Sequence, residues 1–219
     1  MIKKFILGFT ALFFILSGSL ILMMGYVLNK PEAVFDAFQS VTQKFFHSEK
    51  YVEKAEFFLQ SIREVSISTQ NADIVLSIHS QPTLLLELSG EVPPFEKGPF
   101  IIQSAQQSQL IVNVQEPLPS QWVQMNVNGQ EVTQESNVKL TVHIFVPEAY
   151  KDLLTLSTEH GNVSLQLPAN LNYELDLQSL QGPVENHLPP HNPEEIINPE
   201  TLGHIKVRTD DGMITVTGS

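Results

Sequence analysis

Two periodicities of hydrophobic residues divide the chain. Between residues 34 and 46, large apolar residues such as Val34, Phe38 and Val41 recur at helical spacing, which is typical of an amphipathic helix. From Glu64 onward, apolar and polar residues alternate, which is the period of a β-strand with one buried face. Clusters of Gly, Pro, Asn and Ser separate these short alternating runs. The pattern therefore predicts a helical segment followed by an all-β domain.

One strand-turn-strand unit recurs four times in the alternating part. It reads apolar-x-apolar-x-[Ser/Thr]-x-x-[Gly/Ala]-x-apolar. The alternate apolar residues bury one face of each strand, the hydroxyl can bond the turn backbone, and we expect the glycine to supply a positive φ. The first copy has Ala72 in place of the glycine, so we expect its turn to differ. The four copies are Val65–Ile74, Leu154–Val163, Leu175–Val184 and Ile205–Ile214.

The last three copies follow one another closely along the chain. Leu156, Leu177 and Val207 hold equivalent positions at intervals of 21 and 30 residues, a period that indicates stacked rungs. The longer interval contains a proline-rich segment, residues 189–200, which we predict to be a loop because proline lacks a ladder donor. Residues 63–219 are therefore predicted to form an all-β, β-solenoid-like stack of strand-turn-strand repeats. A further hairpin is predicted around the Asn-Gly dipeptide at positions 128–129.

The N-terminus carries an uncharged apolar run, Phe5–Leu28, directly after Lys3 and Lys4. At about 1.5 Å per residue, a helix of this length spans a bilayer core of about 30 Å. The two lysines predict that the N-terminus stays in the cytoplasm. We interpret residues 1–29 as a transmembrane anchor, with a cleaved signal peptide as the alternative, because serines interrupt the run. Both interpretations place the rest of the chain outside the cytoplasm, in the periplasm or at the cell surface.

Residues 30–62 are interpreted as an amphipathic helical linker or cap. The first part carries the Phe-rich face, whereas Glu49–Ile62 fits either a helix or an approach to the first strand. The Phe-rich face could cap the β domain, lie in the membrane interface or mediate dimerisation. Interfacial helices usually have a basic polar face, and this segment does not. Packing against its own domain is therefore the favoured interpretation.

The net charge of the chain limits the classes of molecule that it is expected to bind. The chain has 12 Lys and Arg against 24 Asp and Glu, a formal net charge of −12. Without Lys3 and Lys4 the exported part holds 10 basic residues and has a net charge of −14. This acidity excludes an ordinary nucleic-acid binder and disfavours anionic lipids and wall polymers unless cations bridge them. There is no cysteine, which excludes disulfides, thiolate metal sites and a cysteine nucleophile.

Acidic residues at turn positions of the repeat are the candidate site residues. If neighbouring rungs stack about 4.8 Å apart, carboxylates at matching positions form a ladder that could bind Ca²⁺ or act as paired acids on a polysaccharide. Leu180 and Gln181 hold the matching place in the third copy and are expected to interrupt this ladder. Acidic residues are also common in turns simply because turns are solvated. The candidates are Asp73, Glu159, Asp210 and Asp211.

The sequence has no motif of a known catalytic or cofactor site. It contains no nucleophile elbow, phosphate-binding glycine loop, dinucleotide fingerprint or HExxH sequence. We therefore assign no catalytic, cofactor-binding or metal-ligating residue, expect no cofactor, and do not expect an enzyme.

The repeat resembles a bacterial family, the putative-adhesin or toastrack domain, which has no assigned function and occurs in membrane-anchored envelope proteins. The residues that carry the resemblance are Val65–Ile74 and Val146–Val163, within a similar region of about residues 60–219. The resemblance implies an all-β, solenoid-like fold and a role in adhesion or envelope-stress sensing. It offers no catalytic residues. Ala72 and the proline-rich insertion depart from the usual repeat.

These observations predict a membrane-anchored, extracytoplasmic β-repeat domain that binds a surface or envelope component, either adhesin-like or sensing envelope stress. The expected partners are the membrane, through Phe5–Leu28, and an unidentified envelope protein or polymer. Two alternatives stay open. The domain could be a structural or oligomerising component of an envelope complex, or an enzyme that acts on polysaccharide through the turn carboxylates.

Overall fold

The computed structural model describes residues 48–93, 96–117, 121–127, 130–135, 138–168, 172–188 and 202–218, and only the backbone of 121–127 and 130–135. The predicted anchor Phe5–Leu28, the helical residues 30–47, the dipeptide 128–129 and the loop 189–200 lie outside these ranges. Every regular element in the described ranges is a strand, so the prediction of an all-β domain is confirmed. Within the same ranges, no helix is long and apolar enough to cross a membrane.

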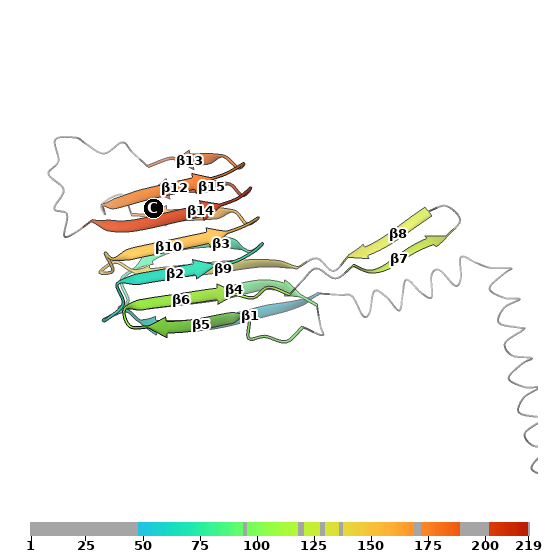
Figure 1. Ribbon diagram of the computed structural model, residues 1–219, viewed down its shortest axis with the longest axis horizontal. Coiled ribbons are helices and arrows are strands. Elements are labelled where there is room, and N and C mark those ends of the chain that lie inside the picture. The colour runs from blue at the N-terminus through green and yellow to red at the C-terminus, as the bar shows by residue number, and fades with distance from the viewer. Residues whose placement is uncertain are drawn as a thin grey trace, which may run out of the picture. The chain divides into compact units, whose positions relative to one another are not determined.

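The strands form two mixed sheets that pack face to face, and a separate hairpin (Figure 1). The seven-stranded sheet has the order β1 (Glu49–Phe58), β4 (Thr83–Val92), β9 (Lys139–Pro147), β3 (Asp73–His79), β11 (Val163–Leu167), β15 (Ile214–Gly218) and β13 (Val184–Asn186). The six-stranded sheet has the order β12 (Tyr173–Ser179), β14 (Gly203–Thr209), β10 (Leu153–Thr158), β2 (Glu64–Ser68), β6 (Gln109–Val114) and β5 (Ile101–Gln106). The hairpin consists of β7 (Gln121–Val127) and β8 (Gln130–Glu135), as the Asn-Gly dipeptide predicted.

Each copy of the repeat crosses from the six-stranded sheet to the seven-stranded sheet and forms one rung of the stack. The four copies are β2–β3, β10–β11, β12–β13 and β14–β15. Neighbouring rungs pair in parallel and in register, so that Leu154 lies beside Val65 on one side and Ile205 on the other. The alternate apolar residues of all these strands face the space between the sheets, where Ile67, Ile74 and many others are fully buried. The equivalence of the copies in sequence is therefore an equivalence of position in the stack.

The order of the rungs differs from the order of the copies in the sequence. Strand β14 pairs with β10 on one side and with β12 on the other, so the fourth copy lies between the second and the third. The third copy, with Leu180 and Gln181, therefore does not lie between the second and the fourth, as its expected interruption of the turn ladder requires. A repeat pattern shows only that the copies can pair with one another, and the long connection from β13 to β14 has enough residues to return the chain past one rung.

The start of the β domain also differs from the prediction. The stretch Glu49–Ile62 was assigned to a helical linker, with a strand approach as the alternative, and the structure has strand β1 there. Its side chains alternate between half-buried and exposed, so Phe57 and Phe58 point to opposite faces. Adjacent large apolar residues suit a helix in sequence, but in β1 only one of the pair faces the core. The β unit consequently begins at Ser48 and not at residue 63.

Strand β1 covers one end of the stack. The Glu53 carboxylate accepts hydrogen bonds from the Tyr51 hydroxyl at 2.7 Å and from the backbone N–H groups of Phe100 at 2.8 Å and Ile101 at 3.2 Å. The Tyr51 and Phe100 rings meet edge to face, with centroids 4.8 Å apart. Burial, together with the hydrogen bond to Glu53, raises the pKa of Tyr51 to about 12. One carboxylate thus ties the start of β5 to the edge strand.

Candidate functional site

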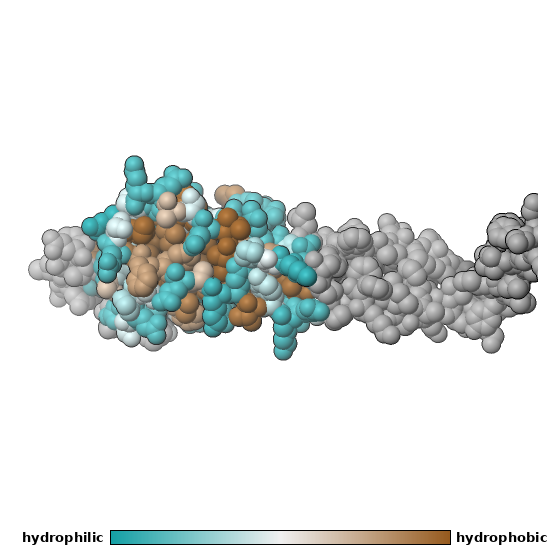
Figure 2. Space-filling view, turned by 90° about the horizontal axis from the view of Figure 1, so that it is seen from below, coloured by the Kyte–Doolittle hydropathy of each residue, from teal (hydrophilic) through white to brown (hydrophobic). Residues whose placement is uncertain are grey.

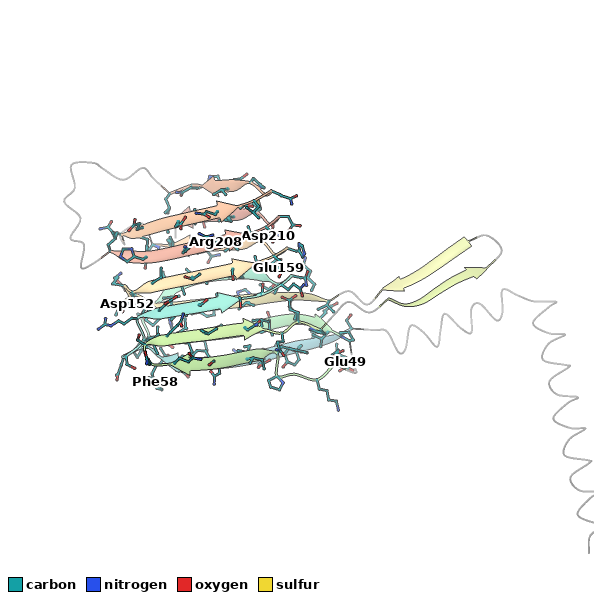
Figure 3. The ribbon with its side chains drawn as sticks, in the orientation of Figure 1. Glu49, Phe58, Asp152, Glu159, Arg208 and Asp210 are labelled. Atoms are coloured by element: carbon teal, nitrogen blue, oxygen red, sulfur yellow. The ribbon has the colours of Figure 1, made fainter. Side chains whose placement is uncertain are left out.

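The turns of the four copies lie together at one edge of the stack, where the chain crosses between the sheets. We call this the turn edge, formed by residues 69–73, 158–162, 179–183 and 209–213. Figure 3 shows Glu159 and Asp210 at the turn edge and Asp152 at the opposite edge. All four predicted site residues belong to these turns, so the turn edge is the first candidate site.

Threonine hydroxyls connect the turns to one another. The Thr209 hydroxyl accepts a hydrogen bond from the Gly212 N–H at 3.0 Å and donates to the Gly161 carbonyl of the neighbouring rung at 3.4 Å. Thr158 makes the same pair of contacts one rung further, with the Gly161 N–H at 3.0 Å and the Ala72 carbonyl at 3.4 Å. Both hydroxyl-bearing residues are buried. The Ser/Thr position of the repeat therefore joins the rungs as well as closing its own turn.

The glycine of the repeat is required by close packing between rungs. A Cβ atom on Gly212 would lie 1.9 Å from the Gly161 carbonyl oxygen, and one on Gly161 would lie 2.0 Å from that of Ala72. Gly182 stands in the same relation to Gly212, at 2.0 Å. None of the three has a φ in the left-handed region. The prediction of a positive φ is therefore wrong, because these glycines serve the close approach of the next backbone.

The first copy ends the ladder of turns in a different way. By the same geometry, the Ala72 methyl group is directed toward β6. Strand β6 is not followed by a tight turn of the repeat, because the β7–β8 hairpin separates it from β9. The Glu116 carboxylate lies beside this turn and accepts hydrogen bonds from the N–H groups of Gln70, Asn71 and Ala72 at 2.9–3.0 Å. Sequence analysis did not single out Glu116. Glu116 comes just after β6 in the sequence. Because β6 pairs with β2 in parallel, the residues after β6 lie beside the turn that follows β2, but this is known only from the structure.

The four predicted acidic residues do not all occupy the same position in the turns. Glu159 and Asp210 hold the same turn position on adjacent rungs, because β10 and β14 pair in register. Leu180, which was expected to stand between them, lies beyond Asp210 at the end of the stack. Asp73 holds a separate position, where its carboxylate accepts the backbone N–H of Asn162 at 2.8 Å and its side-chain amide at 3.2 Å. The four acids are therefore not one column.

Asp211, the fourth predicted residue, pairs with His160 on the adjacent rung. Its carboxylate lies 3.0 Å from Nδ1 of His160, and both side chains are exposed. The hydrogen bond to Asp211 and its negative charge raise the pKa of His160, and the neighbouring turn carboxylates act in the same direction. Within the described residues, no three His, Asp or Glu side chains are placed to hold a metal ion together.

The outer surface of the six-stranded sheet is a second candidate site, which the sequence did not indicate. Parallel pairing aligns its outward side chains in rows that run along the stack, and we call this surface the polar face. One row runs from Gln178 on β12 through Arg208 on β14, Ser157 on β10 and Ser68 on β2 to Asn113 on β6. Adjacent strands lie about 4.8 Å apart, so the row presents one hydrogen-bonding side chain at each such step. Strand register, which no local pattern encodes, creates this row.

The charges on the polar face are largely paired. His204 and Lys206 on β14 lie 3.0 Å and 3.8 Å from Glu174 and Asp176, which occupy the matching positions on β12. Arg208 follows them on the same strand and has no ion-pair partner among the residues that the structure describes. The guanidinium group of Arg208 is therefore available to a ligand.

No family model and no curated protein matches the sequence, whereas several solved structures are similar to it, three of which are described here. One is a putative cell adhesion protein from Clostridium sporogenes, with 9% identity over 79% of this chain and 100% of that chain and a TM-score of 0.38. A putative adhesin from Parabacteroides merdae has 13% identity over 75% of this chain and a TM-score of 0.31, and this chain spans 55% of its length. A putative adhesin from Bacteroides fragilis has 8% identity over 78% of this chain and 98% of that chain, with a TM-score of 0.26.

Proposed function

We propose that this protein is an adhesin-like binding module of the bacterial cell envelope, and that its polar face binds a linear, hydroxyl-rich polymer. The observation that supports this proposal is the row that includes Arg208, Ser157, Ser68 and Asn113. A polymer that lies along the stack meets a guanidinium group, two hydroxyls and an amide in succession. Each can donate to or accept from a sugar hydroxyl.

The stack suits this task because its side chains are held in place before the ligand arrives. The hydroxyl contacts of Thr158 and Thr209 fix one rung against the next, and binding to a rigid surface avoids much of the entropy cost of ordering it. A single hydrogen bond contributes only about 0.5–1.5 kcal/mol net, so affinity depends on repetition along the row. The net charge of −12 favours a neutral polymer over a polyanion.

We assign binding and not catalysis to the protein. Polysaccharide hydrolysis with two carboxyl groups needs one of them to have a raised pKa, usually in apolar surroundings. The turn carboxylates of Asp211 and Asp73 are instead bonded to His160 and Asn162 at exposed positions. Neither carboxyl group therefore lies in the buried, apolar surroundings that are typical of such an acid.

Cosedimentation of the full-length protein in detergent with purified chitin, an insoluble, linear and neutral hydroxyl-rich polymer, tests the binding function. We expect the triple variant Ser68→Ala, Ser157→Ala and Arg208→Ala to bind about tenfold more weakly than the wild type, since three hydrogen-bonding groups are lost. Wild-type protein that stays in the supernatant would contradict the proposed binding of a neutral, hydroxyl-rich polymer.

A matched triple variant on the outer surface of the other sheet is the control. Ser164→Ala, Thr215→Ala and Lys139→Ala remove two hydroxyls and one positive charge, as the test variant does. We expect this control to sediment like the wild type. Equal losses in the two triple variants would show that binding does not take place on the polar face.

We further propose that Phe5–Leu28 anchors the chain in the membrane and that the β domain lies outside the cytoplasm. The support is the charge-flanked apolar run in the sequence. The chain contains no cysteine, so a Glu91→Cys variant carries one exposed thiol. A membrane-impermeant maleimide should label this thiol in spheroplasts without lysis, and labelling that requires lysis would contradict the proposal.

A further inference from the structure

Strand β1 is the free edge of the seven-stranded sheet. It is ten residues long and, among the described residues, it pairs only with β4. Figure 2 looks at this end of the stack from below and shows apolar side chains gathered on it. Val52 and Phe58 of β1 are 60% and 74% exposed, and Figure 3 shows Phe58 at the far end of the strand from Glu49. A long free edge with exposed apolar residues is a template for another strand.

The outward-facing residues of β1 are complementary to the same residues in a second copy. Antiparallel pairing of two β1 strands about a twofold axis at Ala55 places Lys54 of each copy opposite Glu56 of the other. The same register places Val52 of each copy opposite Phe58 of the other. Opposite charges and apolar pairs directly across antiparallel strands both stabilise a sheet. One strand therefore supplies both halves of an isologous interface.

The contacts within one copy orient the two charged side chains on this surface. Lys54 Nζ lies 2.7 Å from Glu87 Oε2, and Glu56 Oε1 accepts the Thr83 hydroxyl at 2.7 Å. In the paired arrangement, Lys54 would lie between Glu87 of its own chain and Glu56 of the second copy. The carboxylate of Glu56 keeps acceptor capacity for that lysine, because a carboxylate accepts several hydrogen bonds.

The other free edges are less suited to self-association. Strand β13 has only three residues and follows Pro183, and a short edge next to proline is protected. Strand β12 has Glu174 and Asp176 on its outward side, so its self-pairing brings carboxylates together. Strand β5 lies at the same end of the stack as β1 (Figure 1) but has only six residues against ten in β1.

We propose that two copies of this chain associate through antiparallel pairing of β1 with β1, with the twofold axis at Ala55. The two seven-stranded sheets then form one continuous sheet across the interface. The polar face takes no part in this contact, so the assembly does not depend on the proposed polymer binding.

Disulfide cross-linking of the full-length chain in detergent tests the position of the axis. Facing Cα atoms in antiparallel strands are about 4.5–5.5 Å apart, within the range that a disulfide bridges. An Ala55→Cys variant, in a chain with no other cysteine, should form a dimer of twice the 24.5 kDa chain under copper phenanthroline oxidation. Ala105→Cys on β5, at the same end of the stack, is the control. We expect cross-linking at position 55 to be at least tenfold faster, and equal rates or no dimer would overturn the proposal.

A charge-reversal pair tests the register without a covalent bond. Lys54→Glu alone places two carboxylates opposite each other in its homodimer, and Glu56→Lys alone places two ammonium groups there. A mixture of the two variants restores both opposite-charge pairs. Sedimentation should show about tenfold stronger association in the mixture than in either variant alone. Association that is equal in all three samples would overturn the proposed register, and circular dichroism confirms that each variant is folded.

Discussion

The hydroxyl of Thr209 accepts a hydrogen bond from the backbone N–H of Gly212 at 3.0 Å, three residues later in the same turn. The same hydroxyl donates to the Gly161 carbonyl of the next rung at 3.4 Å. Because Thr209 is only 2% exposed, water cannot readily replace either partner. One side chain thus closes its own turn and bonds to the neighbouring copy, which makes the Ser/Thr position of the repeat a determinant of stacking.

Replacement of Thr209 by valine should destabilise the domain. Valine keeps the shape but removes the hydroxyl, which leaves the buried Gly212 N–H without its acceptor. We expect the free energy of unfolding to fall by about 1–3 kcal/mol, measured by urea denaturation. Thr155→Val, on the solvent-facing side of β10, is the control and should change stability by less than about 0.5 kcal/mol. Equal losses in both variants would show that the turn hydroxyl has no special role.

Replacement of the turn glycines by alanine should destabilise the stack according to their position. Gly212 lies between two rungs, and a methyl group there meets the Gly161 carbonyl, so Gly212→Ala should cost about 1–3 kcal/mol or more. Gly182 belongs to the last rung, which can shift outward, and we expect a smaller loss for Gly182→Ala. Thermal unfolding followed by circular dichroism ranks the two. A larger loss at Gly182 would contradict the explanation by close packing.

Removal of the Glu116 carboxylate should loosen the first turn. Glu116→Ala takes away the acceptor of three backbone N–H groups. Two of the three contacts are exposed, so water compensates in part, and the expected loss is about 1 kcal/mol. Hydrogen exchange should accelerate at Asn71 and Ala72 in this variant. Glu91→Ala, an exposed residue of β4, should leave both stability and exchange unchanged.

The His160–Asp211 pair should be visible in a titration. The hydrogen bond and charge of Asp211 raise the pKa of His160 above its ordinary value of 6.5, and NMR of the imidazole protons measures this directly. Asp211→Asn should lower that pKa, because the amide carries no negative charge. A pKa that is the same in the wild type and the variant would show that the pair does not form in solution.

The same pair gives stability a defined dependence on pH. Since the pKa of His160 is raised in the folded state, the pair contributes fully below the unfolded-state pKa of about 6.5 and loses its contribution as pH rises through the folded-state pKa. The difference in unfolding free energy between wild type and Asp211→Asn should therefore shrink over that window. Both groups are exposed, so the effect is expected to be small.

Local sequence patterns were enough to identify the repeat but not its geometry. Thr209 and Gly212 were recognised as turn residues because their spacing recurs, yet the role of Gly212 depends on the carbonyl of Gly161, which is 51 residues away in the chain. Glu116 was overlooked for the same reason, since it acts on the turn at residues 70–72. Glu49–Ile62 fitted either a helix or a strand approach, because sequence alone does not show which of the adjacent residues Phe57 and Phe58 faces a core.

The sequence by itself determined that the chain contains an all-β domain with four equivalent strand-turn-strand copies, because alternation and turn chemistry act over a few residues. Only the tertiary structure decided that the fourth copy lies between the second and the third, which sets Glu159 beside Asp210 and leaves Leu180 at the end. It also decided which residues form the polar face and the free edge at β1. Pairing between distant strands is selected by the packing of the whole core. Because the four copies share the same apolar pattern, the local sequence of one copy does not show which other copy it pairs with.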